Sequence, residues 1–225
     1  MKALIAALAR LFLRLKSDRP QTPTAPDLPR LHIAVVVGHN SNPKERGAFA
    51  PQPIGLSEWE FNDKLAREMQ ALAATQTPSL KLSVVYRTAE AGAGYSEETR
   101  RAYAEVDALK ADASIELHFN AASSASARYA LVLSSGSAKS LALAKAFDTA
   151  FERAFPGKPS KIWNHRKGEV KRGAKSLIAG KPPAVLLEPF FASNPTSLKE
   201  MAILGITGLA RLYLGALDAY RKEQA

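Results

Sequence analysis

Short apolar runs alternate with longer amphipathic stretches along most of the chain. The run at 32–38 (HIAVVVG) is rich in β-branched residues and ends in glycine, which indicates a buried strand. The strand pattern recurs at 80–87, 113–121, 129–134 and 183–191. Helical periodicity recurs at 57–74, 97–110, 137–155 and 198–221. This alternation predicts an α/β domain with a mostly parallel or mixed central sheet and helices on both faces.

The first 30 residues have a different pattern. Residues 1–17 are apolar but carry Arg10 and Arg14 four positions apart, on one face of any helix. We expect an amphipathic segment that contacts a membrane surface or a partner; a signal peptide is the alternative, although its uncharged core would span only 3–9. Prolines at four positions make residues 18–30 a linker. The folded domain is therefore expected at 31–225.

Length and composition narrow the class of protein. A chain of 225 residues is long enough for one domain of ordinary size. No uncharged apolar stretch approaches the 18 residues typical of a membrane-spanning helix. Cysteine is absent, which excludes disulfides, thiolate metal sites and thiol nucleophiles. Any metal must therefore be held by His, Asp or Glu.

The net charge of +10 is concentrated in two segments. Residues 1–30 hold six Lys/Arg and two Asp, and residues 156–181 hold eight Lys/Arg and one Glu, which leaves the rest of the chain near neutrality. This distribution suggests a local anionic partner, although a solvated lysine-rich loop explains 156–181 equally well. No nucleic-acid-binding motif is present, so we expect no nucleic-acid partner.

Polar residues stand at the ends of three predicted strands. His39 follows the first strand, His118 lies late in the third, and Glu188 lies late in the strand at 183–191. In open α/β sheets the crevice at the carboxyl ends of the strands is the usual ligand site. A lone strand histidine is more often a hydrogen-bonded structural residue, so the common placement of the three carries the argument.

A fourth candidate lies at the start of the helix predicted at 57–74. Ser57 and Glu60 form the sequence pattern of a capping box, which gives Glu60 a structural role. Glu58, in contrast, shares its helical face with Phe61 and Leu65. A carboxylate on a buried face needs a partner, and a cation is a good one.

These residues predict a zinc site formed by His39, Glu58 and His118. Two His, one carboxylate and a water form a recognised catalytic arrangement, in which the metal lowers the pKa of the water and polarises a carbonyl. Glu188 would be the general base. Glu116 is the rival of Glu58, because it points to the same side of the strand as His118; it would either replace Glu58 or orient an imidazole.

The motifs resemble those of the zinc-dependent N-acetylmuramoyl-L-alanine amidases, which have a single mixed α/β catalytic domain. The family's Gly-His pair matches VVVGHN, its Glu four residues before an Asn matches EWEFN, and its second His matches IELHFNA. Its late segment with the catalytic Glu matches PAVLLEPFFASN, and YRT at 86–88 is similar to the end of its second strand. The resemblance spans roughly 31–215. Asn40, Glu116 and Pro189 depart from the family pattern.

The resemblance implies hydrolysis of the amide between N-acetylmuramic acid and the L-alanine of peptidoglycan stem peptides. It implies Zn²⁺ as cofactor, with ligands His39, Glu58 and His118 and catalytic Glu188. Asn120, Arg166 and Asn194 are the candidates for contact with the peptidoglycan substrate.

Other interpretations remain open. Another zinc amidohydrolase or carboxypeptidase, acting on small N-acyl amino acids or peptides, would use the same residues. A non-catalytic cell-wall-binding protein would use the basic segment alone.

We expect a monomer. This compact domain organisation suits an exported cell-envelope, periplasmic or extracellular enzyme, and equally a phage lysis enzyme made in the host cytoplasm.

Overall fold

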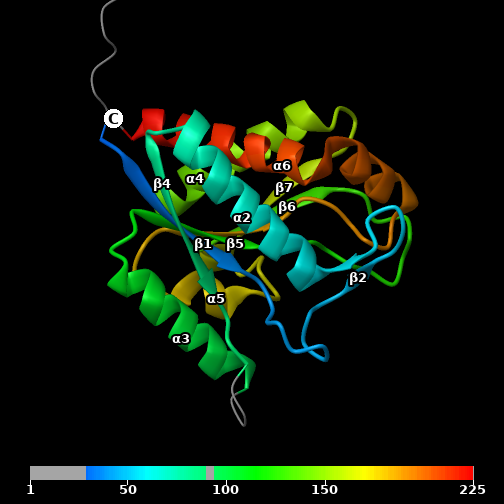
Figure 1. Ribbon diagram of the computed structural model, residues 1–225, viewed down its shortest axis with the longest axis horizontal. Coiled ribbons are helices and arrows are strands. Elements are labelled where there is room, and N and C mark those ends of the chain that lie inside the picture. Colours follow the sequence, from blue (N-terminus) through cyan, green and yellow to red (C-terminus); the bar gives the residue numbers. More distant parts are fainter. Residues whose placement is uncertain (1–28, 90–93, 225) are drawn as a thin grey trace, which may run out of the picture.

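A six-stranded mixed sheet in the order β4-β1-β5-β8-β6-β7 forms the centre of the protein (Figure 1). The structure is a computed structural model that describes residues 29–89 and 94–224, so the expectations for residues 1–17 and for the linker up to residue 28 lie outside the described residues. The strands are β1 (Leu31–Val37), β4 (Leu80–Tyr86), β5 (Ala113–Leu117), β6 (Ala130–Ser134), β7 (Ser160–Asn164) and β8 (Ala184–Glu188). A small hairpin consists of β2 (Phe49–Ala50) and β3 (Leu56–Ser57).

Helices cover both faces of this sheet, as the sequence pattern predicts. The described helices are α2 (Glu58–Gln76), α3 (Tyr95–Ala108), α4 (Ala138–Ala154), α5 (Ala174–Ala179), α6 (Pro195–Glu223) and the 3-10 turn η1 (His165–Lys167). Helices α2, α4 and α6 lie on one face, and α3 and α5 lie on the other (Figure 1). The largest core cluster packs apolar side chains of α2, α4 and α6 against the sheet. Smaller clusters lie beneath α3 and α5.

Strand directions bring His39, His118 and Glu188 to one edge of the sheet. Strands β1, β4, β5 and β8 are parallel, and the register aligns Val37 with Leu117 and Leu117 with Leu187. The residues that follow these aligned positions therefore meet at the carboxyl edge. Strand β6 runs antiparallel to β8, and β7 follows the direction of β6, so β6 and β7 end at the opposite edge.

The structure differs from the expected elements in two main places. The basic segment 156–181 contains β7, η1 and α5 in addition to loops, where no regular element was predicted. Its apolar residues occur in short groups, at Ile162 and Trp163 and at Leu177 and Ile178, which are too short to show a helical or strand period. Strand β5 ends at Leu117, four residues earlier than expected, although the chain continues beside β8 and pairs once more at Asn120 and Phe191.

Helix α6 is longer than the predicted 198–221. Asn194 caps its first turn by accepting from Ser197 N, and Pro195 occupies the first helical position. Gly205 (φ 67°, ψ 171°) breaks the helix into two parts.

By length and composition α6 is also apolar enough to cross a membrane, and it is the one such helix in the described ranges. The search of the sequence for 18 consecutive uncharged apolar residues does not find this helix, because Lys199, Glu200 and Arg211 interrupt it. In the structure its apolar residues, including Leu209, Tyr213, Leu217 and Tyr220, belong to the largest core cluster.

Candidate metal centre

The two strand-end histidines lie close together because Gly38, the residue before His39, has no side chain and lets the His118 ring pack against its backbone. A Cβ on Gly38 would lie 2.4 Å from the imidazole of His118 and 2.5 Å from the carbonyl oxygen of Leu117. His39 adopts a positive φ of 65°, a conformation that non-glycine residues rarely adopt and that clusters at functional sites. Together these features turn the His39 ring towards His118, at 5.1 Å between ring centroids.

Glu58 enters the same space as the first residue of α2. Ser57 and Glu60 form the capping box that the sequence predicts, and this fixes the start of the helix. The Glu58 carboxylate accepts backbone hydrogen bonds from Ala48 (3.2 Å) and Phe119 (3.1 Å). These donors come from the segment before the β2–β3 hairpin and from the end of β5, so three parts of the chain hold one carboxylate in place.

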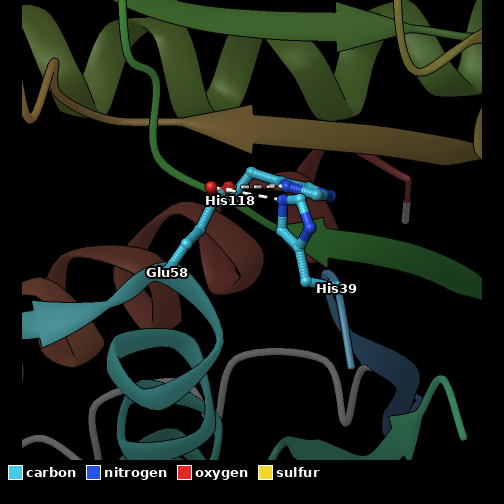
Figure 2. A group of neighbouring side chains, drawn as sticks. All are labelled: His39, Glu58 and His118. Atoms are coloured by element: carbon cyan, nitrogen blue, oxygen red, sulfur yellow. Dashed lines mark hydrogen bonds and ion pairs between the residues drawn. The ribbon is translucent and has the colours of Figure 1, made fainter. Parts of the chain in front are cut away.

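His39, Glu58 and His118 converge as a compact triad (Figure 2). Glu58 Oε1 lies 2.8 Å from His118 Nδ1, and Glu58 Oε2 lies 3.2 Å from His39 Nε2. One ligand atom from each residue lies within 4.8 Å of the other two. Glu58 is buried, whereas both imidazoles keep a partly exposed edge. The three donors thus surround a small volume that opens to the outside.

The triad has the electrostatic character of a cation site. Burial opposes ionisation of Glu58, yet the hydrogen bonds from His118 and His39 hold its pKa below its ordinary value. Burial likewise disfavours the imidazolium of His118, yet the hydrogen bonds to Glu116 and Glu58 raise its pKa to about 10. The buried carboxylates of Glu58 and Glu116 are therefore stabilised by a positive charge close to them.

Glu116 lies on the far side of the His118 ring from the triad. Its Oε1 is 2.9 Å from His118 Nε2, whereas Glu58 faces Nδ1. Tyr103 donates a hydrogen bond to Glu116 (2.9 Å), and Arg87 lies 3.7 Å from it. Burial raises the pKa of Glu116, but His118 and Arg87 outweigh it and lower the pKa to about 2. This geometry is that of a carboxylate that orients an imidazole.

Glu188 lies at the end of β8 beside the triad. Asn120 donates a hydrogen bond to its Oε2. Burial raises the pKa of Glu188 to about 7, while the positive charges of His118 and Arg172 oppose this rise. A carboxylate with a pKa near neutrality accepts and releases protons readily, which suits a general base.

Three aromatic rings connect the elements that carry these residues. Phe61 of α2, Phe119 after β5 and Phe190 after β8 form a mutual cluster, with centroids 4.9–5.9 Å apart. Each ring lies within three residues of Glu58, His118 or Glu188. Packing of these rings therefore fixes the relative positions of three polar side chains.

The triad and Glu188 line a cleft of about 340 Å³, which also includes Asn120, Tyr95, Arg172 and Gly173. Arg166 does not line this cleft; it lines a separate pocket at the opposite edge of the sheet, beside His165 and Lys181. Asn194 caps α6 and donates to the carbonyl of Ala125. A larger groove of about 530 Å³ between α4 and α6 contains no histidine and one carboxylate, so it is the poorer candidate for catalysis.

The donor set fits zinc. Zinc in catalytic sites is held by three protein ligands of the His and carboxylate type, with a further position open. The triad supplies two imidazole nitrogens and one carboxylate, and its open side faces the cleft. Glu116 on the other nitrogen of His118 adds the outer carboxylate that commonly supports such ligands.

The sequence did not single out Arg172, whose guanidinium reaches the cleft. Arg172 Nη2 lies 3.4 Å from Asn120 Oδ1. Arg172 is one of eight cations between residues 156 and 181, and no local pattern separates it from the other seven. The following Gly173 has a positive φ of 75° in the structure, a conformation that the sequence alone does not reveal.

Comparison with known proteins gives a consistent result. The family model described as N-acetylmuramoyl-L-alanine amidase matches residues 33–203. A search of curated proteins finds no match.

Solved structures with the same fold cover most of the chain. The catalytic domain of the CD27L endolysin, which targets Clostridia difficile, is 25% identical with a TM-score of 0.67, over 84% of this chain and 97% of that one. The catalytic domain of the amidase CwlV from Bacillus (Paenibacillus) polymyxa is 18% identical with a TM-score of 0.66, over 85% and 98%. The amidase Ami1 from Mycobacterium smegmatis is 16% identical with a TM-score of 0.65, over 88% and 99%.

Proposed function

The chain belongs to the N-acetylmuramoyl-L-alanine amidase family, and we propose that it carries out the family's reaction at a zinc centre formed by His39, Glu58 and His118. The reaction is hydrolysis of the amide between N-acetylmuramic acid and the L-alanine of peptidoglycan stem peptides. The chain is therefore a hydrolase of the bacterial cell wall. The observation that carries the zinc proposal is the convergence of three ligand atoms within 4.8 Å around a buried carboxylate.

Zinc bound there supplies a Lewis acid that polarises the scissile carbonyl and lowers the pKa of a water. Glu58 carries the one negative charge among the three ligands, and its backbone hydrogen bonds keep both oxygens pointed at the imidazoles. Glu116 acts as a positioning residue, because its contact with Nε2 leaves Nδ1 of His118 free to bind the metal.

Glu188 is the proposed general base. Its carboxylate accepts a proton from the attacking water as the oxygen bonds to the amide carbon, and then transfers that proton to the leaving nitrogen as the C–N bond breaks. The hydrogen bond from Asn120 holds the carboxylate in one orientation. Asn120 also lines the cleft, which supports its role in substrate binding.

Two further proposals concern partners. Residues 1–17 would contact an anionic membrane surface through Arg10 and Arg14. Sedimentation of the full chain with vesicles of anionic or neutral lipid tests this contact, and binding that does not depend on lipid charge argues against it. We also propose that the enzyme is a monomer, which light scattering of the full chain tests.

The decisive assay identifies the bond that is cleaved. Purified peptidoglycan is incubated with the full chain, and the products are analysed by mass spectrometry for stem peptides with a free L-alanine amino group. N-acyl amino acids and short peptides without a muramic acid group serve as alternative substrates. New L-alanine amino ends, absent with Glu188→Gln, support the proposal. Cleavage of the small substrates alone would instead favour a different zinc amidohydrolase or carboxypeptidase.

A further inference from the structure

Among the described residues that line the cleft beside the triad, Arg172 is the one lysine or arginine. The same cleft contains the carboxylates Glu58 and Glu188, so an anionic part of a substrate would be repelled without this cation. Arg87 is also near, but its side chain is buried between Tyr95 and Glu116 and it does not line this cleft.

The guanidinium of Arg172 has unused hydrogen-bonding capacity. Its one hydrogen bond within the described ranges is the long contact of 3.4 Å to Asn120 Oδ1. No carboxylate of the described residues lies within ion-pair distance of it, although Arg46, Arg67, Arg100 and Arg128 all have such partners. Arginine presents five donors in a planar fork that matches a carboxylate in two parallel hydrogen bonds.

The backbone fixes where this side chain begins. Gly173 lies directly on the sheet, where a Cβ would come within 2.9 Å of Leu186 Cδ1. With its positive φ, Gly173 also starts α5. The backbone next to Arg172 is therefore fixed at the lining of the cleft, and its exposed side chain extends towards Asn120.

The amide group of one side chain separates Arg172 from the catalytic carboxylate of Glu188. One amide group, that of Asn120, contacts Glu188 through Nδ2 and Arg172 through Oδ1. In an extended stem peptide the scissile nitrogen and the α-carboxylate of the second residue are separated by at most about 6–7 Å. That residue is a D-glutamate joined through its γ-carboxyl group, so its α-carboxyl group is either free or amidated.

We propose that Arg172 forms a subsite for the free α-carboxylate of this second stem residue, and that the enzyme thereby distinguishes a carboxylate from a carboxamide. The proposal rests on the amidase function above. A carboxylate would form a charge-assisted, two-point contact with Arg172, whereas a carboxamide would offer one neutral acceptor and leave donors unpaired.

Two soluble substrates test the subsite: N-acetylmuramoyl-L-alanyl-D-isoglutamate and the corresponding D-isoglutamine compound. The full-length wild-type enzyme is expected to cleave the carboxylate with a kcat/KM roughly 10–100-fold higher. Arg172→Gln should lower kcat/KM for the carboxylate compound to near the value for the carboxamide, mainly through KM, and should lower the carboxamide value far less. Arg172→Lys should retain part of the preference.

Arg153→Gln is the matched control, because Arg153 lies on α4 in the groove between α4 and α6, away from the cleft. It should leave both values unchanged. Equal cleavage of the two compounds by the wild type would overturn the subsite, whatever the variants do. An equal loss on both compounds in Arg172→Gln would also overturn it, since Arg172 would then act on the chemical step or the fold. Failure of the wild type to cleave either compound or intact peptidoglycan would instead contradict the amidase function.

Discussion

Nε2 of His118 lies 2.9 Å from a carboxylate oxygen of Glu116, on the opposite side of the ring from the nitrogen that faces Glu58. The imidazole is therefore held between two carboxylates, one within the triad and one behind it. Glu116 is fully buried and also accepts from Tyr103, so its own orientation is fixed. A fixed outer carboxylate raises the basicity of the ligand and limits rotation of its ring.

Glu116→Gln tests this relationship. The substitution keeps an acceptor near Nε2 but removes the charge, so we expect zinc affinity to fall by roughly 10–100-fold. Competition with a chromogenic chelator measures the affinity, and circular dichroism establishes that the variant remains folded. Affinity equal to that of the wild type in a folded variant would show that Glu116 does not support the metal site.

The ionisation of Glu188 should determine how activity falls at acidic pH. Burial raises its pKa to about 7, and a general base works only when deprotonated. Activity should therefore rise with pH from about 5 and level off above neutrality, with a midpoint near 7 or lower where a bound cation favours the carboxylate. Measurement of kcat/KM between pH 5 and 9 checks this. Activity that is constant down to pH 5 would argue against Glu188 as the base.

The sequence predicts the triad because each of its residues stands at a defined place in a periodic pattern. His39 and His118 follow apolar strand runs, and the capping box separates the structural Glu60 from Glu58. The role of Glu116 depends on which ring nitrogen it contacts, and spacing along a strand carries no such information. The structure provides it through the separate distances to Nδ1 and Nε2.

The position of Arg166 depends on strand direction, which the hydrophobic pattern does not encode. Strand β6 runs antiparallel to β8, and β7 lies parallel to β6. The end of β7 at Asn164 therefore lies at the sheet edge opposite Glu188, and Arg166 follows it there. Arg172 lines the cleft at the other edge, so the chain crosses back between these two arginines, which composition alone does not reveal.

Gly38 is expected to be intolerant of any side chain. A Cβ at Gly38 would strike both the His118 ring and a backbone carbonyl, so Gly38→Ala should lower stability by about 1–3 kcal/mol and weaken zinc binding. Gly215→Ala is the control, because a Cβ there meets nothing within 4 Å and alanine favours the helix. Thermal unfolding should give a lower Tm for the first variant and an equal or higher Tm for the second. Equal stability of both variants would contradict the close packing of Gly38 on His118.

The buried side chain of Lys158 should make the free energy of unfolding depend on pH. Its ammonium group is buried, lies 4.2 Å from the Phe155 ring centroid and donates to the Pro189 carbonyl at 2.7 Å. Burial lowers its pKa to about 8, below the unfolded value of about 10.5. Between these values the unfolded chain binds more protons, so this lysine makes folding more favourable as pH rises.

The difference in unfolding free energy between wild type and Lys158→Met should therefore shift by about 2 kcal/mol in favour of the wild type from pH 7.5 to 9.5. Urea denaturation at the two pH values measures it. A difference that does not change with pH would show that Lys158 has an ordinary pKa in the folded protein.

Metal content measured together with activity tests the central claim most directly. Full-length wild type, Glu58→Gln and Glu188→Gln are loaded with zinc, freed of excess metal by gel filtration, and analysed by mass spectrometry of the metal and by peptidoglycan cleavage. We expect about one zinc per wild-type chain, much less zinc in Glu58→Gln, and full zinc without activity in Glu188→Gln. A wild type that cleaves peptidoglycan without binding zinc, or a Glu188→Gln variant that loses zinc, would contradict the assignment of the metal ligands and the base.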